Sequence, residues 1–461
     1  MRIVKDGAPP TLFLGNYTVT SGTAECVFDK VHEVLHARGI DCQKVIGFSS
    51  DGAPVMFGRV SGVGVRLAGV SPFLTHIHCV APRCALVASN AALCTNKISN
   101  FRTTVNGEYK LFKYSAVRYE RLRQLHAALD QSDFQSLKEP CSVRWLSLSK
   151  ATESIFANWT SLILELEEES AHGNATTTGL PNQINKYSFV AIAAMLLDVL
   201  PVMDTLNRFF QRDYISLALV RPPVLITRGQ LQDLRDNKGD NEKKFCNAVR
   251  DNMYNGQRLN DVNERAHNTT RERFIDHLVE NLHQRFPAAE LDVVAALGKV
   301  FNIQRYPAAQ EADNYAENAI TVLADKFGQP AGDDAPALIS GDRLKALFPQ
   351  FKRSLQLLGN LTFEEAHQHT ILDFSDDLPE FATLANIALV IPVCSVACEC
   401  SFSLQNPVKT YQRSRLSDCS VDNEMLLSME APDYSSPQAE GFLLRAARKF
   451  GEQKQRSKAH F

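Results

Sequence analysis

The chain has 461 residues, of which 44% are hydrophobic and 22% are charged, and its formal net charge is -3. A chain of this size buries a sizeable core and divides into two or three structural units. The small net charge excludes a protein that coats nucleic acid along its whole surface, so any DNA contact must be local. Eleven cysteines without paired CxxC spacing predict reduced thiols in the cytosol or nucleus. The longest apolar run, residues 189–197, is too short to span a bilayer, so we expect no membrane association.

The first third of the chain alternates between strand and helix patterns. Residues 2–4 and 11–18 are rich in β-formers and flank Asp6-Gly7, which predicts a hairpin. A helix over residues 23–38 and strands over residues 45–48 and 73–78 follow. This order predicts a mostly parallel sheet, whose active groups lie at the carboxyl ends of its strands.

The middle of the chain has a helical pattern. Residues 189–210 predict a buried helix that is interrupted near Pro201, and two amphipathic helices follow, one around residues 274–282 and one around residues 291–300. Polar loops separate these segments at residues 171–181 and 328–337.

Two carboxylates lie next to apolar segments. Asp51 follows the predicted strand over residues 45–48, and Glu399 follows the apolar run over residues 387–393, where a helix is expected to start. Each has a plain structural interpretation, because Asp before Gly commonly caps the next helix and Glu is rarely buried. Spacing alone favours that interpretation for both residues.

Two sequence blocks around these carboxylates resemble hAT-family transposases. The first is Gly47-Phe48-x-Ser50-Asp51-Gly52-Ala53-x-Val55-Met56, which resembles the family's second-aspartate block. The second is Cys398-Glu399-x-Ser401-Phe402-Ser403, preceded by Ile391-Pro392 and followed by Lys409-Thr410 and Arg413-Ser414-Arg415-Leu416. It resembles the C-terminal dimerisation region of the family.

The resemblance implies a ribonuclease-H-like mixed sheet that is split by a large all-helical insertion domain, an α/β plus α fold. It also implies three carboxylates that hold two divalent metals, Mg²⁺ or Mn²⁺, with Asp51 as the second and Glu399 as the third. The family's first aspartate lies on the opening strand, upstream of the hairpin that begins here at Met1. We therefore expect an N-terminally truncated member with an incomplete sheet, and no cofactor for this chain alone.

Two further blocks extend the resemblance. Cys141-Ser142-Val143-Arg144-Trp145-Leu146-Ser147 resembles the family's Arg-Trp motif, which makes Trp145 and Arg144 candidates for DNA contact, the former by stacking on an exposed base. The block that begins at His76 resembles the family's CxxH block, but Pro82 stands where the family has histidine. The spacings around it do not predict a zinc site.

The resemblance and the loops give four parts. They are the first part of the ribonuclease-H-like domain (1–149), the helical insertion (150–375), the dimerisation region that completes the first domain (376–432) and a basic tail (433–461). The predicted dimerisation residues are the apolar side chains of the third part: Leu384, Leu389, Ile391, Phe402, Leu416, Leu426 and Leu427. Packing of these residues against the insertion within one subunit stays an open alternative.

Two functions from different classes follow. The first is a transposase-derived protein that forms a homodimer through its C-terminal region and lacks catalysis because the first aspartate is absent. We expect such a protein in the nucleus, otherwise in the cytoplasm, and without sequence-specific DNA binding because no zinc finger precedes the hairpin. The alternative is a fragment of an active hAT transposase that cuts and joins DNA by two-metal chemistry. The genomic sequence upstream of Met1 distinguishes the two.

Overall fold

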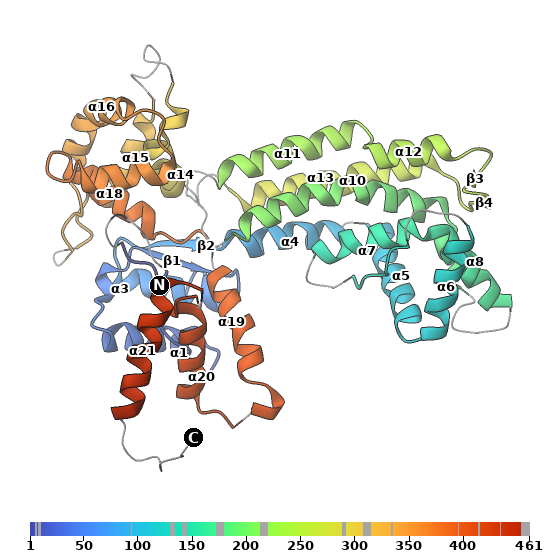
Figure 1. Ribbon diagram of the computed structural model, residues 1–461. Helices are drawn as coiled ribbons and strands as arrows, with labels where there is room; N and C mark the ends of the chain where they lie inside the picture. The colour runs from blue at the N-terminus through green and yellow to red at the C-terminus, as the bar shows by residue number, and fades with distance from the viewer. Residues whose placement is uncertain are drawn as a thin grey trace.

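The protein divides in space into a base, an arm and an upper lobe. A computed structural model describes residues 1–4, 7, 11–93, 95–129, 134–140, 145–171, 179–212, 220–287, 292–307, 315–332, 335–394, 396–413, 415–433 and 435–452, without the side chains of residues 145, 146, 396, 397, 399, 400 and 412. The base comprises residues 11–78 and 391–452, the arm residues 80–285 and the upper lobe residues 292–390. Figure 1 shows the arm extending sideways from the junction of the other two parts.

The elements follow one another through these three parts. The base begins with α1 (Ala24–Ala37), η1 (Cys42–Lys44), β1 (Gly47–Ser50), α2 (Pro54–Phe57), α3 (Val63–Val70) and β2 (Thr75–His78). The arm holds α4 (Val80–Ala92), α5 (Asn96–Lys113), α6 (Ala116–Ala128), α7 (Trp145–Ala157), α8 (Trp159–Ala171), α9 (Leu180–Ile184), α10 (Tyr187–Phe210), α11 (Arg221–Asp236), α12 (Asp240–Ala248), β3 (Met253–Tyr254), β4 (Gln257–Arg258) and α13 (Glu264–Arg285). The upper lobe holds α14 (Asp292–Phe301), η4 (Ile303–Arg305), α15 (Glu317–Phe327), α16 (Gly341–Leu357), α17 (Phe363–Leu372) and α18 (Pro379–Val390). The base resumes with α19 (Val396–Val408), η5 (Tyr411–Arg413), α20 (Asp418–Glu430) and α21 (Pro437–Glu452).

The prediction of a ribonuclease-H-like mixed sheet is wrong. In the described part of the chain, the strands form two sheets of two strands each, β1 with β2 and β3 with β4, and helices make up most of the rest. The predicted hairpin makes only an antiparallel bridge between Arg2 and Thr11, and residues 12–18 join no sheet. The apolar run over residues 387–393 is helical up to Val390. Apolar runs of this length fit a buried helix as well as a strand, which explains the error.

The parallel pair in the base was predicted closely. β1 and β2 pair from Gly47↔Thr75 to Ser50↔His78, and α2 and α3 connect them. Residues 391–393, from the far end of the chain, lie against this pair. A Cβ on Gly47 would lie 2.7 Å from the Pro392 ring and 3.0 Å from the Ile391 Cα, so only glycine permits this approach. The Val80 amide donates to the Val393 carbonyl at 3.2 Å, which fixes the segment in place.

α10 is the central helix of the arm. It runs without interruption through Pro201, so the predicted break is wrong, and 15 of its residues are buried. It is the one described helix that is long and apolar enough to cross a membrane, with a mean hydropathy of 1.9. The 18-residue stretch of α10 with that hydropathy is 72% buried inside the protein, as in the core helix of a globular protein.

The base and the rest of the molecule differ in the size of their cores. One large apolar cluster runs from Phe73, just before β2, through the arm and the upper lobe to Cys394. By contrast, α19 and α20 share a cluster of three buried side chains, Val408, Val421 and Met425, with Phe13 and Leu416 packed against it. Among the side chains that the structure describes, the C-terminal helices of the base therefore have little apolar burial of their own.

Candidate dimerisation surface

α18 is a core helix of the upper lobe. Its Phe381 ring stacks on Phe351 of α16 at 4.0 Å between centroids, with the ring planes 12° apart. Leu384, Leu389 and Ile391 are each at most 2% exposed. This part of the chain is therefore packed within one subunit and offers no apolar surface through those three side chains.

α19 and α20 form an antiparallel pair. The Ser401 hydroxyl lies 3.3 Å from the Met429 sulfur, while Val408 at the other end of α19 clusters with Val421 at the beginning of α20. The Ser417 side chain caps α20 by accepting from the Ser420 amide at 3.2 Å. Glu424 on α20 pairs with Arg413 of the connecting segment at 2.5 Å. The pair is thus held by its ends and by a narrow apolar seam.

An extended N-terminal segment, residues 12–18, lies along α20. The Phe13 amide donates to Glu430 at 2.8 Å and the Asn16 amide to Asp422 at 2.6 Å. The Thr18 hydroxyl donates to Asp418 at 3.2 Å. These three carboxylates recur at multiples of four along α20, so they share one face of the helix. That face replaces the sheet that the sequence pattern predicted as the partner of this segment.

Residues 371–431 match the hAT family C-terminal dimerisation region. The match begins at the last turn of α17, includes α18, α19 and α20, and ends just before α21. It supports the predicted relationship to the hAT family and self-association of the chain through this region.

The seven predicted contact residues of the hAT dimerisation region fall into two classes. Leu384, Leu389 and Ile391 lie in the core of the protomer, as described above, and Leu416 is half-buried against the α19–α20 seam. The exposed class comprises Phe402, Leu426 and Leu427, with exposed fractions of 64%, 42% and 53%. Tyr411, which the sequence did not single out, is almost fully exposed.

Asp51 lies at the carboxyl end of β1, as predicted, but its carboxylate has a local partner. Oδ1 accepts the Ala53 amide at 3.2 Å, which is a turn that leads into α2. Beside it, the Ser50 hydroxyl lies 3.1 Å from His76 Nε2. Burial, followed by the nearby Arg83 guanidinium, lowers the pKa of His76 to about 4. Burial and Arg83 also lower the pKa of His78 to about 4, although Asp51 opposes that shift.

The other predicted site residues are placed only in part. Glu399 lies on α19 and Trp145 begins α7, but their side chains are outside the described part of the chain, as is the whole of Arg144. Among the described residues, no three His, Cys, Asp or Glu side chains come together in a group that could hold a metal ion. The residues described around Asp51 therefore do not fit the family's metal pair, and we derive no metal-dependent step from them.

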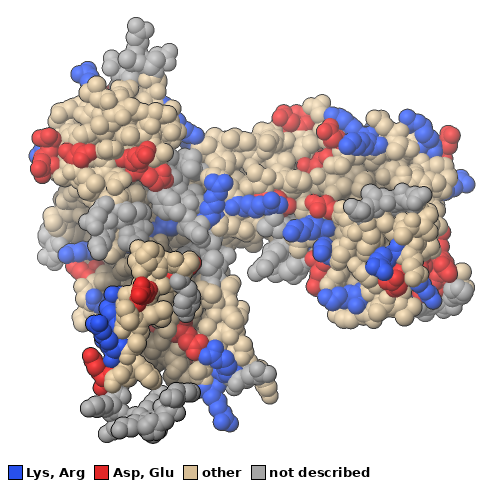
Figure 2. All heavy atoms as spheres, viewed as in Figure 1, with Lys and Arg blue, Asp and Glu red and all other residues tan. Residues whose placement is uncertain are grey.

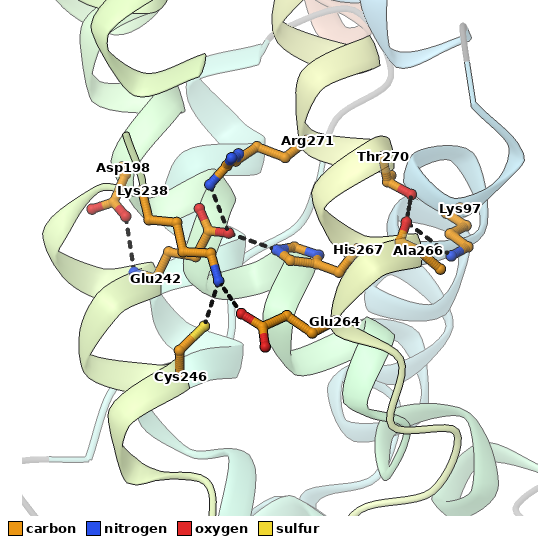
Figure 3. Close-up of polar contacts among 10 residues, drawn as sticks. All are labelled: Lys97, Asp198, Lys238, Glu242, Cys246, Glu264, Ala266, His267, Thr270 and Arg271. Atoms are coloured by element: carbon orange, nitrogen blue, oxygen red, sulfur yellow. Dashed lines mark hydrogen bonds and ion pairs between the residues drawn. The ribbon is translucent and has the colours of Figure 1, made fainter. Parts of the chain in front are cut away.

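A buried polar cluster joins α10, α12 and α13 inside the arm, and sequence patterns did not reveal it (Figure 3). His267 Nε2 lies 2.8 Å from Glu242 Oε1, and Arg271 lies 3.5 Å from the same oxygen. Nearby, Lys238 contacts Glu264 at 2.5 Å and the Cys246 sulfur at 3.4 Å. Glu242 and His267 are each 1% exposed. The Lys238–Glu264 pair reaches the surface, because the Glu264 side chain is 59% exposed. The Glu242–His267 pair is closed to solvent, so it connects α12 and α13 and does not form an open site.

Proposed function

We propose that this chain is a transposase-related protein whose activity is to form a homodimer through the exposed apolar side chains of α19 and α20. The observation that carries the proposal is the combination of a match to a dimerisation region with Phe402 and Leu427 more than half exposed beside a three-residue seam. Obligate dimer interfaces resemble a core that is divided between two subunits. A second copy would supply the missing half.

The test is a double substitution of two exposed residues, Phe402→Asp with Leu427→Asp. We expect the dissociation constant of the dimer to rise about 100-fold, because charge replaces two apolar anchors. Analytical ultracentrifugation of the full chain over a micromolar concentration range measures it. Substitution of Leu389 would not serve, because Leu389 is 2% exposed and its loss would damage the fold itself.

Leu357→Asp is the matched control. Leu357 lies on α16, outside the matched region, and is 87% exposed. It should leave the dissociation constant unchanged. A wild-type chain that is monomeric throughout the concentration range would refute the proposal.

We further propose that dimerisation is retained without DNA strand cleavage. The turn that Asp51 makes with Ala53 supports this, because it gives the carboxylate a structural use. The wild-type chain is expected to leave a hairpin-forming DNA substrate intact in Mn²⁺. Cleavage by the wild type that disappears in both Asp51→Asn and Glu399→Gln would show the chain to be an enzyme instead.

A further inference from the structure

α21 follows the matched region and is almost wholly exposed. It has 16 residues, of which Ala439 is the only one that is buried. Leu443, Leu444 and Phe450 are 49%, 54% and 70% exposed. Isolated helices of this length are marginal in water, so most of their stability comes from packing of an apolar face. Beyond the buried Ala439 and the half-buried Phe442, α21 packs little of its surface against the described residues of its own subunit.

The sequence of α21 defines the face that needs a partner. Leu443, Ala446 and Phe450 are separated by three and four residues, which places them along one side of the helix, on the side that begins at the buried Ala439. Arg445, Arg448 and Lys449 occupy other positions. The second half of α21, residues 443–450, thus combines an apolar stripe with three basic residues and no acidic one.

α20 has the complementary character. It carries Asp418, Asp422, Glu424 and Glu430 and no basic residue. Asp418 and Glu424 form ion pairs with Lys409 and Arg413 of their own subunit, whereas Asp422 and Glu430 each accept a single backbone amide. Its Leu426 and Leu427 are exposed among these carboxylates. Figure 1 shows α19, α20 and α21 projecting from the same side of the base, and Figure 2 shows acidic and basic side chains together on that part of the surface. A basic apolar stripe and an acidic apolar helix therefore lie in one continuous region of the chain.

We propose that α21 is a second part of the dimer interface, in which its apolar stripe packs on α20 of a second copy and its basic residues lie near Asp422 and Glu430, the two α20 carboxylates without an ion pair to a basic residue in the described part of the chain. This rests on the proposed function and extends it beyond residue 431. In a two-fold dimer each copy contributes one α20 and one α21, so the contact occurs twice. Stable interfaces bury about 800 Å² per partner, and α21 adds apolar surface next to the few exposed side chains of α19 and α20.

The experiment uses the full chain in two variants, Leu443→Asp/Phe450→Asp and Arg445→Glu/Arg448→Glu/Lys449→Glu. The first removes the stripe, and we expect the dissociation constant to rise about tenfold or more. The second changes only exposed charges, so the fold is retained. We expect a rise of similar size at low salt that shrinks toward none at 1 M NaCl, where charges are screened within about 3 Å.

The outcomes separate the two proposals. A wild-type dimer whose dissociation constant neither variant changes refutes the role of α21 and leaves the proposed function standing. A monomeric wild type refutes both. If the variants have lower thermal stability but an unchanged dissociation constant, α21 folds onto its own subunit. If they bind DNA more weakly with an unchanged dissociation constant, α21 forms a nucleic-acid-binding surface. Either result overturns the role of α21 in the dimer.

Discussion

Two buried ionisable residues, Glu108 in the arm and His367 in the upper lobe, affect stability in opposite pH ranges. Glu108 on α5 is fully buried, and neither of its carboxylate oxygens has a hydrogen-bond partner among the described residues. Burial raises its pKa to about 8. His367 on α17 is also fully buried, with its ring against Phe301 and Phe363. Burial lowers its pKa to about 4.

Replacement of Glu108 by Gln should stabilise the protein at neutral and alkaline pH. The folded state holds the carboxyl neutral, so its contribution is complete below the unfolded pKa and is lost as pH rises toward 8. We expect Glu108→Gln to raise the free energy of unfolding by roughly 3 kcal/mol at pH 7 and to have little effect at pH 4.5. Urea denaturation at both pH values measures it. An equal gain at both would show that the carboxyl does not titrate on unfolding.

His367 should produce a loss of stability in acid. The Nδ1–H group donates to the Phe363 carbonyl, and the neutral ring must gain a proton in the unfolded chain below pH 6.5. Stability is therefore lost as pH falls from 6.5 toward 4, by roughly 3 kcal/mol for this group. In His367→Gln, the free energy of unfolding should depend less steeply on pH over this range. Equal slopes in the wild type and in His367→Gln would contradict the assignment.

At this scale, the sequence shows which residues are apolar or charged but not what surrounds them in the folded protein. Leu389 and Leu427 both looked like interface residues, yet one is 2% and the other 53% exposed. A pattern of apolar residues does not say whether the burying surface is the same subunit or a second one. Asp51 was placed at a strand end correctly, and its turn with Ala53 is the structural alternative that spacing alone had favoured.

At the scale of elements, Asp198 shows how one side chain couples two helices. It lies on α10, where a charge in an apolar run looks like a breaker, and it caps α12 instead. Its oxygens accept the backbone amides of Asn241 and Glu242, both at 3.0 Å. A Cβ on Gly239 would lie 2.3 Å from the Asp198 carboxyl carbon, so glycine makes room for this cap.

Asp198→Ala should lower the free energy of unfolding by about 1–2 kcal/mol, since it leaves two amides at the beginning of α12 without their acceptor. Thermal and urea denaturation measure the change. Asp233→Ala on the exposed side of α11 is the control and should stay within about 0.5 kcal/mol of the wild type. A loss no larger than that of the control would mean that water replaces the cap.

Helices and strands were predicted correctly where the signals that define them are local in the sequence. β1, β2 and α1 were predicted with small errors in their ends, because their periodicity and caps are local. α18 could not be assigned from its sequence, because its buried apolar residues fit either a helix or a strand until its neighbours are known. The N-terminal segment was expected to join a sheet, and two of its amides and the Thr18 hydroxyl instead donate to carboxylates of α20 that lie about 400 residues away.

At the scale of the whole molecule, the distribution of apolar burial predicts where the protein opens first. The arm and upper lobe share one large core, whereas the described side chains of α19 and α20 include three that are buried in their common cluster, and α21 has one. Regions with few buried contacts open more readily than core helices.

Hydrogen exchange should therefore depend on protein concentration in the C-terminal helices alone. We expect amides of α19, α20 and α21 to exchange rapidly in dilute solution and more slowly as the concentration rises through the dissociation constant. Amides of α10 should exchange slowly at every concentration. Mass spectrometry of peptides from both regions measures the difference, and exchange in α19–α21 that is the same at all concentrations would argue against an interface there.

The contact of Gly47 with residues 391–393 also bears on the order in which the protein folds during synthesis. β1 and β2 leave the ribosome early, but the segment that lies against them is made some 345 residues after Gly47. At about 5–20 residues per second, β1 and β2 wait for tens of seconds while the arm and upper lobe are made. The base is thus begun before the arm and upper lobe and completed after them. During that interval the face of β1 at Gly47 lacks its covering segment, which makes the nascent base a part of the chain that depends on a chaperone.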